Sequence, residues 1–263
     1  MESDIFKVEI EDGIARCSMN SVENMNALSV KLGYPMVEGL NSVLADDDVR
    51  VIVLRGEGGH FCSGADLDLL GENHDPTFLN QSMSALAPVI HELYSGPKPV
   101  ITEVDGFAVG GGMGLALASD ITYATERALF CMGFIRIEAA PDMGSSYFLA
   151  ERVGAARAKE MALTGDIVDA GEALRIGLVN RVVDHDIISG EVMELAAKIA
   201  RRSPRAVSWT KQVLNRYHLL ELRTVLDLEC NVQPVMLLCE EHREAVKKIK
   251  ERWDRGMGAR DGI

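Results

Sequence analysis

The sequence is short of positive charge and has no long apolar run. Lys and Arg total 27 against 40 Asp and Glu, which gives a formal net charge of -13. It contains no basic block of the kind that neutralises phosphate backbones, so we expect no nucleic-acid partner. Since no apolar run approaches the ~18 residues of a membrane-spanning helix, we also expect no membrane partner.

Cysteine is scarce and irregularly placed. The five cysteines are odd in number, widely spaced and without a CxxC pair, which favours neither a disulfide framework nor a zinc site. The first residues, MESDIFKVEIEDG, are acidic and alternating, unlike a signal peptide or an Arg-rich transit segment. Together these features predict a cytoplasmic protein in a reducing compartment, without a bound metal.

Apolar patterning predicts an α/β core followed by a helical C-terminal region. Residues 6–20 alternate around Asp12-Gly13, which is a hairpin signal. Helical spacing at 26–48 precedes a buried strand at 49–54, and residues 99–112 and 119–131 are typical of further strands around a short helix at 113–120. Strand and helix alternate to about residue 185, which predicts an α/β fold with largely parallel strands. From Gly190 onward the spacing is helical.

Two loops with small side chains each follow an expected buried strand. The first is GHFCSGADL at 59–67, and the second is the glycine triplet at 110–112. Each precedes an expected helix and can offer main-chain N–H groups to a ligand. On neighbouring strands, the two loops would aim one N–H each at a single oxygen, as in an oxyanion hole. Either loop alone is more typical of a tight turn, and neither has the spacing of a dinucleotide-binding fingerprint.

Three ordered blocks of sequence carry a resemblance to a known family. They are VIVLRGEGGHFCSGADL, KPVITEVDGFAVGGGMGLALASDITYATERALF and RAKEMALTGDIVDAGEALRIGLVNRVV. In combination they resemble the crotonase superfamily, also called the enoyl-CoA hydratase/isomerase family. The resemblance implies an α/β crotonase-like spiral of ββα repeats over residues 1–200 and a helical trimerisation region at 201–263. It also implies a homotrimer or a dimer of trimers.

The same resemblance implies a ligand and the residues that meet it. The ligand is an acyl-CoA thioester, with no cofactor beyond the coenzyme A moiety of the substrate. The N–H groups of Ala65 and Gly111 are expected to bind the thioester carbonyl oxygen. For coenzyme A we expect contacts from Ser63, Gly64, Asp66, Leu67 and a C-terminal lysine, with Lys247, Lys248 and Lys250 as candidates for the phosphates. For the side chain of Asp66, a helix-capping role is the simpler interpretation. For the acyl pocket we expect Met83, Leu86, Phe134 and Met132.

The acid and base groups decide the reaction. Hydratases of the family use two glutamates, and the matching positions here are Gly114 and Phe134, neither of which moves a proton. Asp142, in the segment FIRIEAAPDMGSSYFL, lies where several family isomerases carry a single acid. One carboxylate suffices to move a proton from C2 of a 3-enoyl thioester to C4 through a dienolate. An aspartate before a helix is also typical of an N-cap.

Three alternatives remain open at this level. A hydratase or hydrolase would recruit Glu92, Glu138 or Asp142 in another way. A non-catalytic acyl-CoA binder would retain the glycine loops without needing the acid. The chain also resembles 4-chlorobenzoyl-CoA dehalogenases, in which an aspartate at the position of Asp142 attacks the ring. Those enzymes carry a tryptophan at the position of Phe134 and a histidine at that of Glu92, which argues against dehalogenation.

Overall fold

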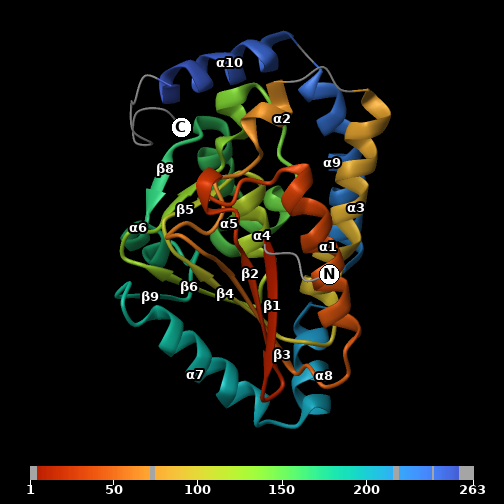
Figure 1. Cartoon of the computed structure of the whole chain (residues 1–263), viewed down its shortest axis with the longest axis vertical. Coiled ribbons are helices and arrows are strands. Elements are labelled where there is room, and N and C mark those ends of the chain that lie inside the picture. Colours follow the sequence, from red (N-terminus) through yellow and green to blue (C-terminus); the bar gives the residue numbers. More distant parts are fainter. Residues whose placement is uncertain (1–4, 72–74, 216–218, 239, 255–263) are drawn as a thin grey trace.

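A six-stranded sheet forms the centre of the molecule (Figure 1). The computed structural model describes residues 5–71, 75–215, 219–238 and 240–254. The strand order is β1-β2-β3-β4-β6-β9, and only the β1–β2 pair within it is antiparallel. These strands span Phe6–Glu11, Ile14–Met19, Val51–Gly56, Val100–Val104, Ile121–Thr125 and Arg181–Val183. The expected α/β fold with largely parallel strands is therefore confirmed.

The opening hairpin turns at the predicted place. Asp12 and Gly13 both have positive φ, 51° and 77°, as a two-residue turn of the primed type requires. The register pairs Glu11 with Ile14 and Phe6 with Met19. This hairpin adds β1 to the edge of the sheet and leaves β2 parallel to β3.

The expected single strand over 99–112 is wrong, because the chain leaves the central sheet at Gly106. Residues 100–104 form β4, whereas β5, Phe107–Val109, belongs to a second sheet with β7, Leu129–Cys131, and β8, Ile167–Asp169. Gly106 has φ +54°, and a methyl group there would lie 2.3 Å from the carbonyl oxygen of Gly59. The stretch 119–131 divides in the same way, into β6 and β7. These breaks carry the following loops away from the central sheet.

Helices cover both faces of the central sheet, which explains its apolar strands. Helix α7, Ile188–Ala200, packs on one face, where Val192 and Ala196 meet Val51, Val53 and Ile101. The main core lies on the other side of the sheet and includes buried residues of α1, Val30–Ala45, α3, Pro76–Ser95, α4, Gly111–Leu117, and α5, Ser145–Thr164. The short elements η1, Val22–Asn24, α2, Leu67–Gly71, η2, Gly133–Ile137, and α6, Ala170–Arg175, connect these parts.

The C-terminal region is helical, as its spacing predicted, and its helices fold back along the core. They are α8, Pro204–Asn215, α9, Leu219–Leu237, and α10, Glu240–Asp254. Helix α9 lies beside α3, and α10 contacts α2 and η2 (Figure 1). The C-terminal helices thus contact segments that lie far from them in the chain. Within the described residues, no helix has the length and apolar character needed to cross a bilayer.

Candidate active site

Main-chain hydrogen bonds hold the first glycine loop between two neighbouring segments. On one side, the N–H of Leu28 donates to the Gly64 carbonyl at 2.7 Å, and the N–H of Asp66 donates to the Leu28 carbonyl at 3.2 Å. On the other side, the N–H of Cys62 donates to Phe107 at 2.8 Å, and Cys62 accepts from the N–H of Val109 at 3.0 Å. The loop therefore behaves as a short extra strand with a defined position.

Asn26 clamps the start of this loop, and sequence reasoning missed it. Its side chain is fully buried and donates from Nδ2 to the carbonyl oxygens of Glu57, at 2.9 Å, and His60, at 2.8 Å. Its Oδ1 accepts from the N–H of Ser21 at 2.8 Å. All of these partners are main-chain atoms, which the sequence does not distinguish from one residue to the next. The one signal for this clamp is the residue type, because a buried asparagine must satisfy both the NH₂ and the oxygen of its amide.

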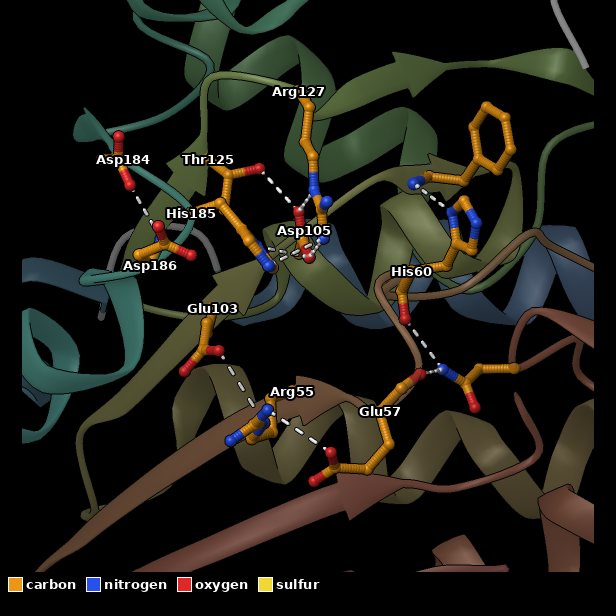
Figure 2. A network of polar contacts seen from close by, with 12 residues as sticks. Arg55, Glu57, His60, Glu103, Asp105, Thr125, Arg127, Asp184, His185 and Asp186 are labelled. Atoms are coloured by element: carbon orange, nitrogen blue, oxygen red, sulfur yellow. Dashed lines mark hydrogen bonds and ion pairs between the residues drawn. The ribbon is translucent and has the colours of Figure 1, made fainter.

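A polar network supports the loop from behind (Figure 2). Asp105 accepts hydrogen bonds from Thr125 Oγ1 at 2.8 Å and from Arg127 Nε at 2.6 Å, and His185 Nδ1 lies 3.1 Å from Asp105 Oδ2. Burial alone would raise the pKa of Asp105, but the hydrogen bonds from Arg127 and Thr125 outweigh it and hold that pKa below its usual value. The Asp105 carbonyl in turn accepts from the N–H of Phe61 at 2.7 Å. The network thereby fixes the turn on which the first loop rests.

The side chain of His60 packs against β5 in the same region. Its ring stacks on Phe107 with the centroids 4.8 Å apart, and its Nδ1 accepts from the Phe107 N–H at 3.3 Å. Burial lowers its pKa, which favours the neutral ring that this acceptor role requires. The histidine next to the loop is therefore accounted for by packing.

The second glycine loop lies directly against the first. Gly110 has φ +52° and precedes α4. A methyl group at Gly112 would lie 2.7 Å from the Cβ, the Sγ and the carbonyl oxygen of Cys62. Burial raises the pKa of the Cys62 thiol to about 12, so the cysteine packs here as a neutral side chain. The absence of a side chain at Gly112 is what allows the two loops to touch.

Both loops open onto one cavity of about 490 Å³. Ala65 and Gly111 line it, and in the described part of the chain their N–H groups have no hydrogen-bond acceptor. Main-chain N–H groups without a protein partner form their hydrogen bonds with water or with a ligand. The cavity therefore has two donors available for an acceptor oxygen.

Asp142 contributes a buried carboxylate to the same cavity. Its side chain is 8% exposed, and its Oδ1 lies 3.3 Å from the position that a Cβ of Gly111 would occupy. The N-cap position of α5 belongs to Gly144, which has φ +70°. The other carboxylates that line the cavity, Glu23, Asp66 and Asp68, are more exposed.

Neither of the two positions that carry glutamates in family hydratases holds a carboxylate here, and Gly114 also has no room for a side chain. A Cβ at Gly114 would lie 2.9 Å from the Met143 carbonyl oxygen and 3.1 Å from the Cβ atoms of Met143 and Ser145. Phe134 is buried, and its ring lies 3.5 Å from the Cβ position of Gly110. Glu92 and Glu138 are exposed and do not belong to the cavity lining.

Most of the residues expected from the sequence meet in this one cavity. Its lining includes Asp142, Ala65, Gly111, Ser63, Gly64, Asp66, Leu67, Leu86, Phe134 and Lys250. Asp66 Oδ1 also accepts from the N–H of Asp68 at 2.9 Å, which agrees with a capping role at α2. Lys250 pairs with Asp68 and so links α10 to α2, whereas Lys247 and Lys248 are exposed outside the lining.

Two expected pocket residues are not found in the cavity lining. Met132 is 1% exposed, lies between β7 and η2, and packs in the main core, so its expected place in the acyl pocket is corrected. The side chain of Met83 falls outside the described part of the structure. Sequence reasoning also missed Gln233 of α9, which is 3% exposed and lines the cavity. No cluster of three or more potential metal ligands occurs among the described residues.

Comparison with known proteins gives one consistent family. The family model for enoyl-CoA hydratase/isomerase matches residues 9–256. A 1,2-epoxyphenylacetyl-CoA isomerase from Escherichia coli (strain K12) is 33% identical over 242 residues, which cover 90% of this chain and 92% of the relative. A peroxisomal Delta(3,5)-Delta(2,4)-dienoyl-CoA isomerase from Arabidopsis thaliana is 30% identical over 255 residues, 92% of each chain. The solved structure of an enoyl-CoA hydratase from Mycobacterium avium subsp. paratuberculosis K-10 superposes with a TM-score of 0.86 at 29% identity, covering 94% of this chain and 96% of that one.

Proposed function

Because the chain belongs to the enoyl-CoA hydratase/isomerase family, we propose that it is an enoyl-CoA isomerase with Asp142 as its single acid/base. The thioester carbonyl oxygen accepts hydrogen bonds from the N–H groups of Ala65 and Gly111. Asp142 removes a proton from C2 of a 3-enoyl thioester, and the electron pair moves through the dienolate. The same proton then returns at C4, which leaves the double bond between C2 and C3.

One observation carries this proposal, namely the closeness of a buried carboxylate to Gly111. The 3.3 Å between Asp142 Oδ1 and the Cβ position of Gly111 supports a geometry in which acid and oxyanion donor share one substrate. Preorganised donors at the oxygen where charge gathers typically contribute ~3 kcal/mol each to the barrier reduction. A base within hydrogen-bond reach of the substrate contributes a further ~10²- to 10⁴-fold. Both terms favour a proton shuttle that uses no cofactor.

The absence of glutamates at the two hydratase positions favours isomerisation over hydration. Hydration by two glutamates needs carboxylates at the places of Gly114 and Phe134. The 2.9 Å contact from the Cβ position of Gly114 to the Met143 carbonyl is tighter than any side chain tolerates without a backbone shift. Water activation therefore has no second carboxylate on that side of the cavity, whereas a proton shuttle needs only Asp142.

We assign the remaining cavity residues to the two ends of the substrate. Ser63, Gly64, Asp66 and Leu67 lie on the first loop and meet coenzyme A through their main chain. Lys250, half-buried at the cavity, exchanges its partner Asp68 for a phosphate of coenzyme A. Leu86 and Phe134 contact the acyl chain, whose apolar character matches these side chains.

The test compares two substrates and one variant. Wild-type protein receives 3-hexenoyl-CoA or crotonyl-CoA, and absorbance of the conjugated thioester is followed. We expect the signal to rise with 3-hexenoyl-CoA and to be lost in Asp142→Asn, which keeps the size of the side chain but cannot take up the proton. We expect no change with crotonyl-CoA.

Other outcomes would contradict this assignment. Loss of the crotonyl-CoA signal would indicate a hydratase. No reaction with either substrate, combined with tight binding of both, would indicate an acyl-CoA binder. Equal isomerisation by wild type and Asp142→Asn would keep the reaction but exclude Asp142 as the acid/base.

We further propose that residues 201–263 form the oligomerisation region of a homotrimer or a dimer of trimers. Trp209 and Leu214 of α8 are 61% and 72% exposed in the single chain, and Val235 of α9 is 63% exposed. Large apolar side chains at such exposure favour a covered surface. Light scattering after size-exclusion chromatography should give a multiple of three chains, and Trp209→Arg should shift the mass towards the monomer. A monomeric wild type would contradict the proposal.

A further inference from the structure

Helix α9 reaches the cavity through one polar side chain, Gln233. This glutamine is 3% exposed and lies 91 residues from Asp142 in the chain. Its Nε2 is 3.0 Å from Asp142 Oδ2, and its Oε1 is 3.1 Å from the main-chain nitrogen of Ala140. The glutamine thus bridges the acid to the main chain two residues before it.

The chemistry of the two partners determines the orientation of the amide. The Ala140 N–H can only donate, so the amide oxygen must face it. The NH₂ group then faces the carboxylate, to which it donates. A flipped amide would oppose donor to donor at Ala140 and acceptor to acceptor at Asp142. The orientation therefore follows from hydrogen bonding alone.

We propose that Gln233 is a positioning residue that holds Asp142 in the orientation needed for proton transfer. The donor on Oδ2 fixes one carboxylate oxygen, while Oδ1 is the oxygen beside Gly111. The proposal rests on the isomerase mechanism, in which Oδ1 takes up and returns the substrate proton. A hydrogen-bond donor to a carboxylate favours its ionised form.

Gln233 is the neutral polar residue that α9 places against Asp142, and charged residues lie around the same cavity. The other charged residues that line the cavity are Glu23, Asp66, Asp68, Arg136 and Lys250. Helix α4 carries no charged residue, and η2 contributes Arg136 with Glu138 as its C-cap. On α5 the nearest charged residues in sequence are Glu151 and Arg152. The test must therefore separate loss of the amide from a general change in charge.

The variant Gln233→Leu removes the amide without adding charge and nearly keeps the volume. We expect kcat on 3-hexenoyl-CoA to fall roughly 10- to 100-fold, the loss expected for one hydrogen bond to a charged group. KM should change by less than about threefold, because coenzyme A contacts are untouched. The acidic limb of the kcat–pH profile should move up by about one pH unit, since the ionised base has lost a donor.

Asn231→Leu provides a matched control on the same helix. Asn231 is exposed and donates to the Asp227 carbonyl at 2.7 Å, so its replacement also deletes one amide from α9. The control should leave kcat and the pH profile as in wild type. A Gln233→Leu protein whose kcat stays within twofold, with an unmoved acidic limb, would overturn the proposal.

A second variant and a readout without turnover cover the remaining outcomes. Gln233→Glu keeps an acceptor for Ala140 but places two carboxyl groups in one site, which separates their ionisation. Carbon-13 NMR of the Asp142 carboxyl, assigned by its loss in Asp142→Asn, should show its titration moved to higher pH in Gln233→Glu. An unmoved titration overturns the proposal, even if Gln233→Leu does not fold. If wild type converts no 3-enoyl thioester, the isomerase assignment fails, and the NMR titration alone decides whether Gln233 holds the carboxylate.

Discussion

The contact between the two glycine loops predicts a large effect from one methyl group, in Gly112→Ala. Three atoms of Cys62 would lie 2.7 Å from the new Cβ, whereas non-bonded carbon atoms prefer about 3.5–4.0 Å. The loops must therefore separate by roughly 1 Å. Overpacking of this kind costs about 1–3 kcal/mol of stability. Displacing an oxyanion donor by a similar distance should lower kcat about 10²-fold.

The assay pairs urea denaturation with isomerase kinetics. Cys62→Gly removes two of the three contacting atoms and leaves the carbonyl oxygen, so the double variant should recover part of both losses. The recovery measures the coupling between the loops as a double-mutant cycle. A Gly112→Ala protein with stability within about 0.5 kcal/mol of wild type and undiminished kcat would refute the tight apposition, because surface substitutions away from such contacts change that little.

Three further predictions concern the scaffold around the site. Gly190→Ala in α7 meets no atom within 4 Å and should raise the free energy of unfolding by about 0.5–1 kcal/mol; an unchanged or lower melting temperature would speak against it. Asp105→Asn should cost about 1 kcal/mol, because Arg127 is half-exposed and screened. Folding lowers the pKa of Asp105. The stability lost in Asp105→Asn should therefore be complete above about pH 4 and should vanish as the pH falls through the pKa of Asp105 in the folded protein. A loss of stability that stays independent of pH down to acid unfolding would contradict the ion pair. Lys211→Met should cost about 3 kcal/mol in urea denaturation, because it leaves the half-buried Asp120 without the ammonium 2.8 Å away and with Arg152 as its remaining cation. A cost below about 1 kcal/mol would mean that the pair is dispensable.

Local patterns in the sequence predicted the elements that depend on near neighbours. The hairpin at Asp12-Gly13 and the two glycine loops are set by turn chemistry and by strands that end where glycine begins. The strand over 99–112 failed because Asp105-Gly106 interrupts its apolar character and the backbone turns there. This dipeptide is a turn signal of the same kind as Asp12-Gly13, so the sequence did indicate the break that the single-strand prediction passed over.

Long-range partners of the candidate acid were beyond sequence reasoning. The spacing from Gly190 onward predicted that the segment of α9 is helical, but it does not say which element that helix meets. Gln233 faces Asp142 only because α9 lies beside α3 and closes one side of the cavity. Met132 was misplaced for the related reason that a residue between a strand and a 3₁₀ helix has no fixed periodicity.

Isotope transfer within one turnover tests the single-acid mechanism most directly. The wild-type protein receives 3-hexenoyl-CoA that carries deuterium at both C2 positions, in ordinary water. Because Asp142 is buried beside Gly111, the deuteron that it removes should return before it exchanges with solvent. We predict a conjugated product with deuterium at C4 by mass spectrometry and NMR. A product that carries only solvent hydrogen at C4 would contradict the mechanism.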